Sequence, residues 1–236
     1  MPSRRSKKIR TEITKHKRQN PSFLGFLERP ALGWLSTHMP RWVTPDMLTI
    51  FGFLSAVLIG VSYALSKNNP AFLWLASLGF FLNWFGDSLD GTLARKRNIE
   101  RPKYGFFIDH TTDALAEVIM FVGLGLSGYV DMTLALIALV GYFLMSILVY
   151  IYTYACGTFR IAYIGLGPTE FRAIAIIANA LIFFIGNPII KLPFLTFHLY
   201  DAIVAVVAAI LYGGYIVVTI VKAIELAKQE VIPPQI

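Results

Sequence analysis

Cysteine is almost absent from this 236-residue chain, in which Cys156 is the single thiol. One cysteine excludes a framework of disulfides within the chain. The first 20 residues contain no apolar run, so a cleaved signal peptide is not expected. The sequence also has no internal repeat of the kind found in many transporters.

Charged residues are scarce too, at 15% of the chain, whereas hydrophobic residues make up 56% and the mean hydropathy is +0.62. Soluble domains are less apolar than this. A helix crosses the roughly 30 Å core of a bilayer with about 20 apolar residues, and several stretches reach that length. The composition therefore predicts an all-α integral membrane protein.

Six stretches fit transmembrane helices, and we predict a bundle built from them. They cover residues 44–66, 70–86 with a polar extension to residue 95, 105–130, 132–155, 170–189 and 197–221. Thr44 is the expected N-cap of the first helix, and Pro45 suits its first position. Before it, residues 21–43 mix aromatic and charged side chains, which predicts an amphipathic helix lying in the membrane interface. An ordinary linker is the alternative for this segment.

Basic residues are concentrated on one side of the predicted membrane. Ten of the 21 Lys and Arg residues precede Pro45, and five more lie between Arg95 and Lys103. Because cytoplasmic connections carry the excess of Lys and Arg, both termini are expected in the cytosol. The basic start of the chain favours anionic lipid over nucleic acid as its partner. The predicted divisions are a basic cytosolic tail (1–20), the interfacial helix (21–43), the six-span domain (44–227) and a second cytosolic tail (228–236).

Carboxylates and small residues share a face at each end of one predicted connection. In the second span they lie at i, i+3, i+4 and i+7, and in the third they are spaced by four, so each set lies on one face of its helix. These residues are Asp87, Asp90, Gly91 and Ala94 in the second span and Gly105, Asp109 and Asp113 in the third.

Four carboxylates at membrane helix ends would repel one another unless they were neutralised. Oxygen ligands with one nearby histidine and no cysteine favour hard cations, Mg²⁺ or Mn²⁺. Two such ions could hold a pyrophosphate and stabilise both the attacking and the leaving oxygen, and Arg95 is placed to hold a phosphate. The alternative is that these acids form solvated ion pairs with the basic residues between Arg95 and Lys103. Four acids in this spacing, with small residues between them, make that alternative less favourable.

The pattern D-x-x-D-G-x-x-A-R followed by G-x-x-x-D-x-x-x-D resembles the signature of the CDP-alcohol phosphotransferase (CDP-alcohol phosphatidyltransferase) family, class I. The spacer between its two halves is one residue longer than in the usual motif. The matching residues are Asp87, Asp90, Gly91, Ala94, Arg95, Gly105, Asp109 and Asp113.

The resemblance implies a six-span fold, often homodimeric, that cleaves a CDP-alcohol, releases CMP and joins the phospho-alcohol to a second alcohol. It implies two Mg²⁺ or Mn²⁺ ions held by Asp87, Asp90 and Asp109, with Asp113 as a ligand or the general base. A cytosolic active site agrees with the charge distribution, since the nucleotide donor is soluble. The residues implied to contact the CDP-alcohol are Pro45, Asp46, Thr49, Gly91, Ala94, Arg95 and Gly105.

Two further positions resemble the choline/ethanolamine phosphotransferase branch, in which the acceptor is diacylglycerol. His110 follows Asp109, and Glu170 follows Thr169 before the fifth span. By this resemblance His110 is a candidate base and Glu170 its partner. The alternatives are that His110 packs beside the metal site and that Glu170 is favoured by the helix macrodipole.

Two arginines point to the other branch, in which phosphatidyl passes from CDP-diacylglycerol to a polyol or polyol phosphate. Arg160 and Arg172 could bind an acceptor phosphate. They could equally be residues that snorkel at the cytosolic edge. The sequence leaves the two branches open, although both lead to a phospholipid.

Two other classes of protein compete with an enzyme. A small transporter would hold its carboxylates near the bilayer midplane, whereas these acids lie at helix ends. A structural membrane scaffold would keep its function after Asp87→Asn. The motif favours the enzyme over both.

Overall fold

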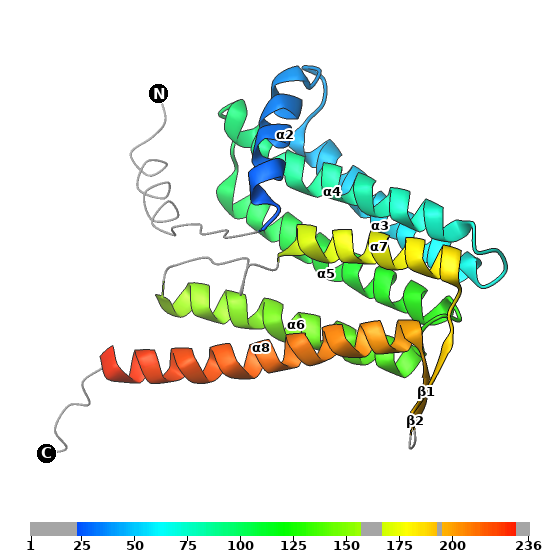
Figure 1. The fold of residues 1–236 in the computed structure, drawn as a ribbon. Helices are drawn as coiled ribbons and strands as arrows, with labels where there is room; N and C mark the ends of the chain where they lie inside the picture. Colours follow the sequence, from blue (N-terminus) through cyan, green and yellow to red (C-terminus); the bar gives the residue numbers. More distant parts are fainter. Residues whose placement is uncertain (1–22, 157–166, 193–194, 230–236) are drawn as a thin grey trace, which may run out of the picture.

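The computed structural model describes residues 23–156, 167–192 and 195–229, and helices make up most of them (Figure 1). A short antiparallel hairpin pairs Ile189 with His198 and Leu192 with Leu195. The predicted all-α class is confirmed apart from this hairpin. The elements are α2 (Gly25–His38), α3 (Pro45–Ser66), α4 (Phe72–Lys96), α5 (Pro102–Leu126), α6 (Met132–Cys156), α7 (Pro168–Ile185), β1 (Ile189–Leu192), β2 (Leu195–His198) and α8 (Leu199–Gln229).

Four helices, α3, α6, α7 and α8, are long and apolar enough to cross a membrane. Helices α4 and α5 have 25 residues each but carry the predicted carboxylates, which lower their apolar content. The chain is therefore a multi-pass membrane protein. The count of six spans stays a prediction, as does the interfacial position of α2.

The first spanning helix begins where the sequence predicts. The Thr44 hydroxyl accepts a hydrogen bond from the Met47 N–H at 3.2 Å, and Pro45 is the first helical residue. The backbone of Thr44 is extended, as an N-cap requires.

The connection between the last two helices differs from the prediction. Helix α7 ends at Ile185 because Gly186 adopts a φ of +77°, a left-handed conformation that glycine accepts and that stops a helix. Pro188 then removes a backbone donor, and β1 begins at Ile189. The predicted helix ends at residues 189 and 197 were therefore wrong, because both positions lie in the hairpin.

Close backbone contact joins α3 and α4 near the carboxylates. A Cβ atom on Gly86 would lie 2.6 Å from the Gly52 nitrogen and 2.7 Å from the Leu48 carbonyl oxygen, so no larger residue fits at position 86 without movement. Small residues allow this approach between membrane helices. Asp87, the next residue, is thereby fixed beside α3.

A buried polar cluster ties four helices together deeper in the bundle. The Asn179 side-chain oxygen accepts hydrogen bonds from the hydroxyls of Tyr63 at 3.0 Å and Tyr200 at 2.7 Å. Its amide nitrogen donates to the Ser77 hydroxyl at 3.2 Å. Because each of these polar groups has a partner, the cluster joins α3, α4, α7 and α8 without leaving a buried amide unsatisfied.

The helices run roughly alongside one another, and their connections fall at two ends (Figure 1). Helix α2 and the α4–α5 connection lie at one end, and the hairpin lies at the other. The start of α3, the end of α4, the start of α5 and the start of α7 all meet at the α2 end. These segments contain most of the residues that the sequence predicts to be functional.

Candidate active site

Three of the four predicted carboxylates line one small pocket. Asp87 comes from α4, and Asp109 and Asp113 come from α5. Thr49 and Gly52 of α3 line the same pocket. The two helical faces predicted from residue spacing therefore do face each other, with α3 closing the third side.

Part of this pocket has the arrangement of a metal site. One potential ligand atom from each of Asp109, His110 and Asp113 lies within 4.8 Å of the others. The His110 Nδ1 atom is 3.8 Å from an Asp109 carboxylate oxygen. A donor set rich in carboxylate oxygen fits Mg²⁺ or Mn²⁺ better than softer metals.

Asp90 takes a different position from the other three carboxylates. It accepts a 2.6 Å hydrogen bond from the Thr49 hydroxyl, and it also accepts one from the Gly91 N–H. It is not among the residues that line the small pocket. Its predicted role as a metal ligand stays a prediction, and its contacts join the end of α4 to the start of α3.

Arg172 points into the site and not toward the membrane edge. Its guanidinium donates to the Asp87 carboxylate at 2.6 Å and to the Asn83 side-chain oxygen at 2.8 Å. The side chains of Arg172 and Asp87 are 15% and 23% exposed, so the pair is largely screened from solvent. This placement does not match snorkelling. Asn83 was missed, although a polar residue one turn before Asp87 in an apolar span was a usable signal.

Residues predicted to contact the CDP-alcohol surround the same end of the bundle. Asp46 pairs with Arg101 of the α4–α5 connection, and this hydrogen bond raises the pKa of the Arg101 guanidinium above its ordinary value. Arg95 is exposed and donates to the Thr92 hydroxyl at 3.1 Å. The structure leaves open space beside Gly105, where an added Cβ would meet no atom within 4 Å.

Arg97 organises the loop that leads into α3. Its guanidinium donates to the carbonyl oxygens of Met39 at 3.0 Å, Pro40 at 2.8 Å and Val43 at 2.5 Å. These bonds fix the start of α3 against the end of α4. No local pattern singles out Arg97 for this role, because it is one of five cations between residues 95 and 103.

His110 lies between aromatic rings at the start of α5. Its ring centroid is 4.2 Å from that of Phe106, in an edge-to-face arrangement, and 5.2 Å from that of Tyr150. This packing holds the imidazole beside Asp109 and Asp113. Both predicted roles, base and packing residue, are compatible with that position.

The Glu170 carboxylate accepts hydrogen bonds from two backbone N–H groups. One carboxylate oxygen accepts from the Leu24 N–H and the other from the Gly167 N–H, each at 2.8 Å. The residue is 6% exposed. These contacts cap α7 and tie it to the segment before α2, so they are those of a structural residue. Its predicted catalytic role stays a prediction. Arg160 lies outside the described residues.

Helix α2 is fastened to the site by a second carboxylate, Glu28. One of its oxygens accepts hydrogen bonds from Trp84 at 3.1 Å, Ser88 at 3.0 Å and Thr169 at 3.1 Å. These donors come from α4 and α7, and two of them, Ser88 and Thr169, are next to Asp87 and Glu170 in sequence. Glu28 therefore links the N-terminal helix directly to the helices that carry the site.

We expect Glu28→Ala to destabilise the protein by roughly 3 kcal/mol, because hydrogen bonds to a charged group contribute about 1.5–3 kcal/mol each and three donors lose one acceptor together. Thermal unfolding in detergent measures the loss. Glu100→Ala, in the exposed α4–α5 connection, is the matched control and should change the midpoint little. Equal midpoints for the two variants would show that Glu28 does not fasten α2.

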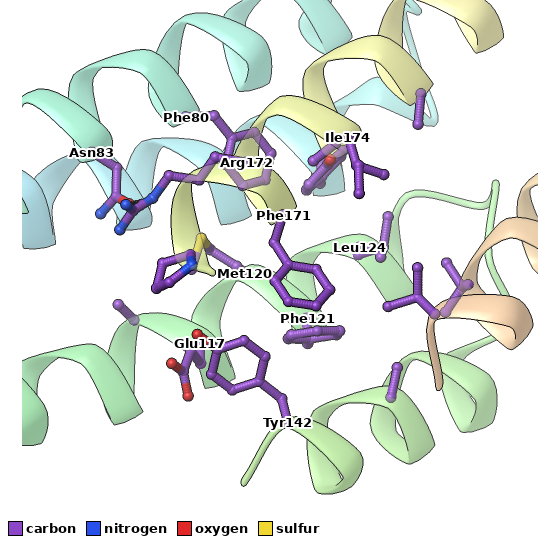
Figure 2. A pocket seen from close by; sticks show the side chains of 18 of the residues that line it. Phe80, Asn83, Glu117, Met120, Phe121, Leu124, Tyr142, Phe171, Arg172 and Ile174 are labelled. Carbon is purple, nitrogen blue, oxygen red and sulfur yellow. Dashed lines mark hydrogen bonds between the residues drawn. The ribbon is translucent and has the colours of Figure 1, made fainter. Parts of the chain in front are cut away.

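A larger cavity of about 200 Å³ leads from the carboxylates into the bundle (Figure 2). Asp87, Asp113 and Arg172 lie at its polar end. The rest is mainly apolar and is formed by residues of α3, α4, α5, α6, α7 and α8. Two further polar residues, Glu117 and Tyr142, lie side by side in it, and the sequence motif includes neither (Figure 2).

Comparison with known proteins identifies the family. The sequence model of the CDP-alcohol phosphatidyltransferase family matches residues 42–221. The chain belongs to this family. The resemblance seen in the paired aspartate motifs is thereby confirmed, and the CDP-alcohol phosphatidyltransferase match extends from the loop before α3 into α8.

Relatives within the family have different names. Archaetidylinositol phosphate synthase of Pyrococcus horikoshii is 36% identical over 104 residues, covering 44% of this chain and 52% of that protein. Cholinephosphotransferase 1 of Danio rerio is 28% identical over 195 residues, covering 77% of this chain and 50% of that protein. Cholinephosphotransferase 1 of Rattus norvegicus is 33% identical over 96 residues, 38% of this chain and 24% of that protein. The chain thus matches about half, or less, of the length of these CDP-alcohol phosphatidyltransferase relatives.

Proposed function

We propose that the protein transfers a substituted phosphate group from a CDP-alcohol to a second alcohol, releases CMP and so makes a phospholipid. One observation carries this proposal. Asp87, Asp109 and Asp113, which belong to both halves of the family motif, line the same small pocket. The names of the relatives, a phospholipid synthase and two cholinephosphotransferases, support the same reaction type.

In the proposed reaction, the oxygen of the acceptor alcohol forms a bond to the β-phosphorus of the donor. The bond from that phosphorus to the bridging oxygen breaks, and CMP leaves with the bridging oxygen. Asp113 or His110 takes the acceptor proton as general base. The aromatic neighbours of His110 support its part by fixing the ring beside the carboxylates.

Asp87, Asp90, Asp109 and Asp113 are the residues that would hold two Mg²⁺ or Mn²⁺ ions. Bound ions supply positive charge that offsets the charge of the pyrophosphate and of the departing CMP. Arg172 orients the Asp87 carboxylate, and Thr49 orients that of Asp90. The CDP-alcohol is held at the α2 end of the bundle by Pro45, Asp46, Thr49, Gly91, Ala94, Arg95 and Gly105.

The proposed setting is a cell membrane crossed six times, with both termini and the active site on the cytosolic side. The basic residues around the α4–α5 connection support this orientation. Exposed aromatic residues on and beside α2, among them Phe26, Trp34 and Trp42, support its position in the interface. A homodimer, with membrane lipid around it and no nucleic acid partner, completes the proposal.

Removal of divalent metal tests the reaction. Purified protein in lipid nanodiscs, offered a panel of CDP-alcohols and a membrane lipid extract, should release CMP with Mg²⁺ or Mn²⁺. Excess EDTA should lower the rate to background, and added Mg²⁺ should restore it. A rate of CMP release that EDTA does not change would contradict the metal assignment. The absence of CMP with every donor would contradict the proposed enzymatic reaction.

A further inference from the structure

The cavity contains a carboxylate that the family motif does not include. Glu117 lies four residues after Asp113 on α5, so it continues the acidic face by one helical turn into the bundle. The Tyr142 side chain, from α6, lies beside it in the cavity. Figure 2 shows the two side chains together in the cavity, on the side away from Arg172.

The charges around the cavity disfavour an anionic acceptor. Among the described residues that line it, Arg172 is the single cation, and its guanidinium is already bonded to Asp87 and Asn83. Deeper in the cavity none of the described lining residues offers a cation to an acceptor phosphate. Moving an unpaired charge into a largely apolar enclosure is costly.

The same surroundings suit an uncharged alcohol with an apolar body. The two oxygens of a carboxyl group can bind more than one partner, so Glu117 can bind an alcohol hydroxyl while it lies beside Tyr142. Beyond this pair the walls are hydrophobic and offer a place for hydrocarbon chains. The residues forming these walls include Met120, Phe121, Leu124, Phe171 and Ile174.

We propose that the cavity binds an uncharged lipid alcohol as the phosphate acceptor, and that Glu117 and Tyr142 hold its hydroxyl near Asp113. This inference rests on the proposed function and adds the class of acceptor to it. Glu117 accepts a hydrogen bond from the acceptor hydroxyl, and Tyr142 fixes the Glu117 carboxylate. The site determines specificity, because a polyol phosphate finds no cation deeper in the cavity, whereas a lipid alcohol finds a hydrogen bond at Glu117 and apolar walls.

A direct comparison of acceptors tests the class. Purified protein in nanodiscs with Mg²⁺ receives either a diacylglycerol with CDP-choline and CDP-ethanolamine, or inositol phosphate and glycerol phosphate with CDP-diacylglycerol. We expect CMP and a new phospholipid, seen by mass spectrometry, with diacylglycerol only. Product with a polyol phosphate only would overturn the inference and leave the proposed function standing. No CMP with any pair would overturn both.

Two variants test the residues. Glu117→Gln should raise the KM for the lipid alcohol about tenfold, and Tyr142→Phe should raise it about threefold, since Glu117 binds the hydroxyl directly and Tyr142 acts by positioning Glu117. The KM for the CDP-alcohol should stay within twofold. Glu225→Gln and Tyr212→Phe, at the contacts of α8 with Lys222 and with the Ile137 carbonyl, are the matched controls. An unchanged acceptor KM in both variants, or an equal rise in both KM values, would overturn the role.

Discussion

Replacement of Asp113 by asparagine should lower CMP release by about 10³-fold, because charge stabilisation by bound metal is worth several kcal/mol and each 1.4 kcal/mol is a factor of ten. Asp113 lines both the small pocket and the larger cavity, so in the proposed reaction it would face both the donor and the acceptor. Asparagine keeps the shape of the side chain and removes its charge and its basicity. The rate of CMP release at saturating donor and acceptor measures the effect.

The control for Asp113→Asn is Asp131→Asn. Asp131 lies in the α5–α6 connection, where its carboxylate accepts the N–H groups of Thr133 at 2.9 Å and Leu134 at 3.2 Å. Asparagine caps a helix about as well as aspartate does, so this variant should keep nearly full activity. Wild-type activity in a folded Asp113→Asn protein would show that Asp113 is not part of the active site.

Replacement of Arg172 by methionine should destabilise the metal-free protein by about 3–5 kcal/mol, because removal of one partner leaves the other charge buried and unpaired. Asp87 and Asn83 both lose a donor that lies less than 3 Å away. Thermal unfolding in detergent with EDTA measures the loss. Lys222→Met, which breaks an exposed pair with Glu225, should cost no more than about 1 kcal/mol.

A double variant separates the structural role of Arg172 from its role in the site. Asp87→Asn combined with Arg172→Met should recover much of the lost stability, because no unpaired carboxylate remains. Activity should stay low, since Asp87 is a predicted metal ligand. If the double variant is as unstable as Arg172→Met alone, the Arg172–Asp87 pair is not what the mutation breaks.

Local sequence patterns predict much of this architecture. Spacings of three and four residues determine which side chains share a helical face. The sequence therefore predicts the carboxylate-bearing faces of α4 and α5. The Thr44–Pro45 pair likewise marks a helix start through its own chemistry. These signals are short-range, and the structure confirms the start of α3 and the meeting of Asp87 with Asp109 and Asp113.

Contacts between distant segments could not be predicted in the same way. Arg172 is 85 residues from Asp87, and Glu28 is 141 residues from Thr169. Local sequence patterns do not predict which donor bonds which carboxylate, because those contacts depend on how α2, α4 and α7 pack. The hairpin after α7 was missed for a different reason. Its isoleucines look apolar enough to extend a helix, and Gly186 and Pro188 are the short-range signals that end it.

We expect Asp87, Asp109 and Asp113 to hold divalent ions against the phosphates of a CDP-alcohol. Anomalous X-ray scattering from crystals grown with Mn²⁺ and a CDP-alcohol measures this most directly. The predicted result is two manganese peaks between α4 and α5, with carboxylate oxygens of these residues within about 2.5 Å of manganese. Bound CDP-alcohol with no manganese peak at these carboxylates would contradict the account.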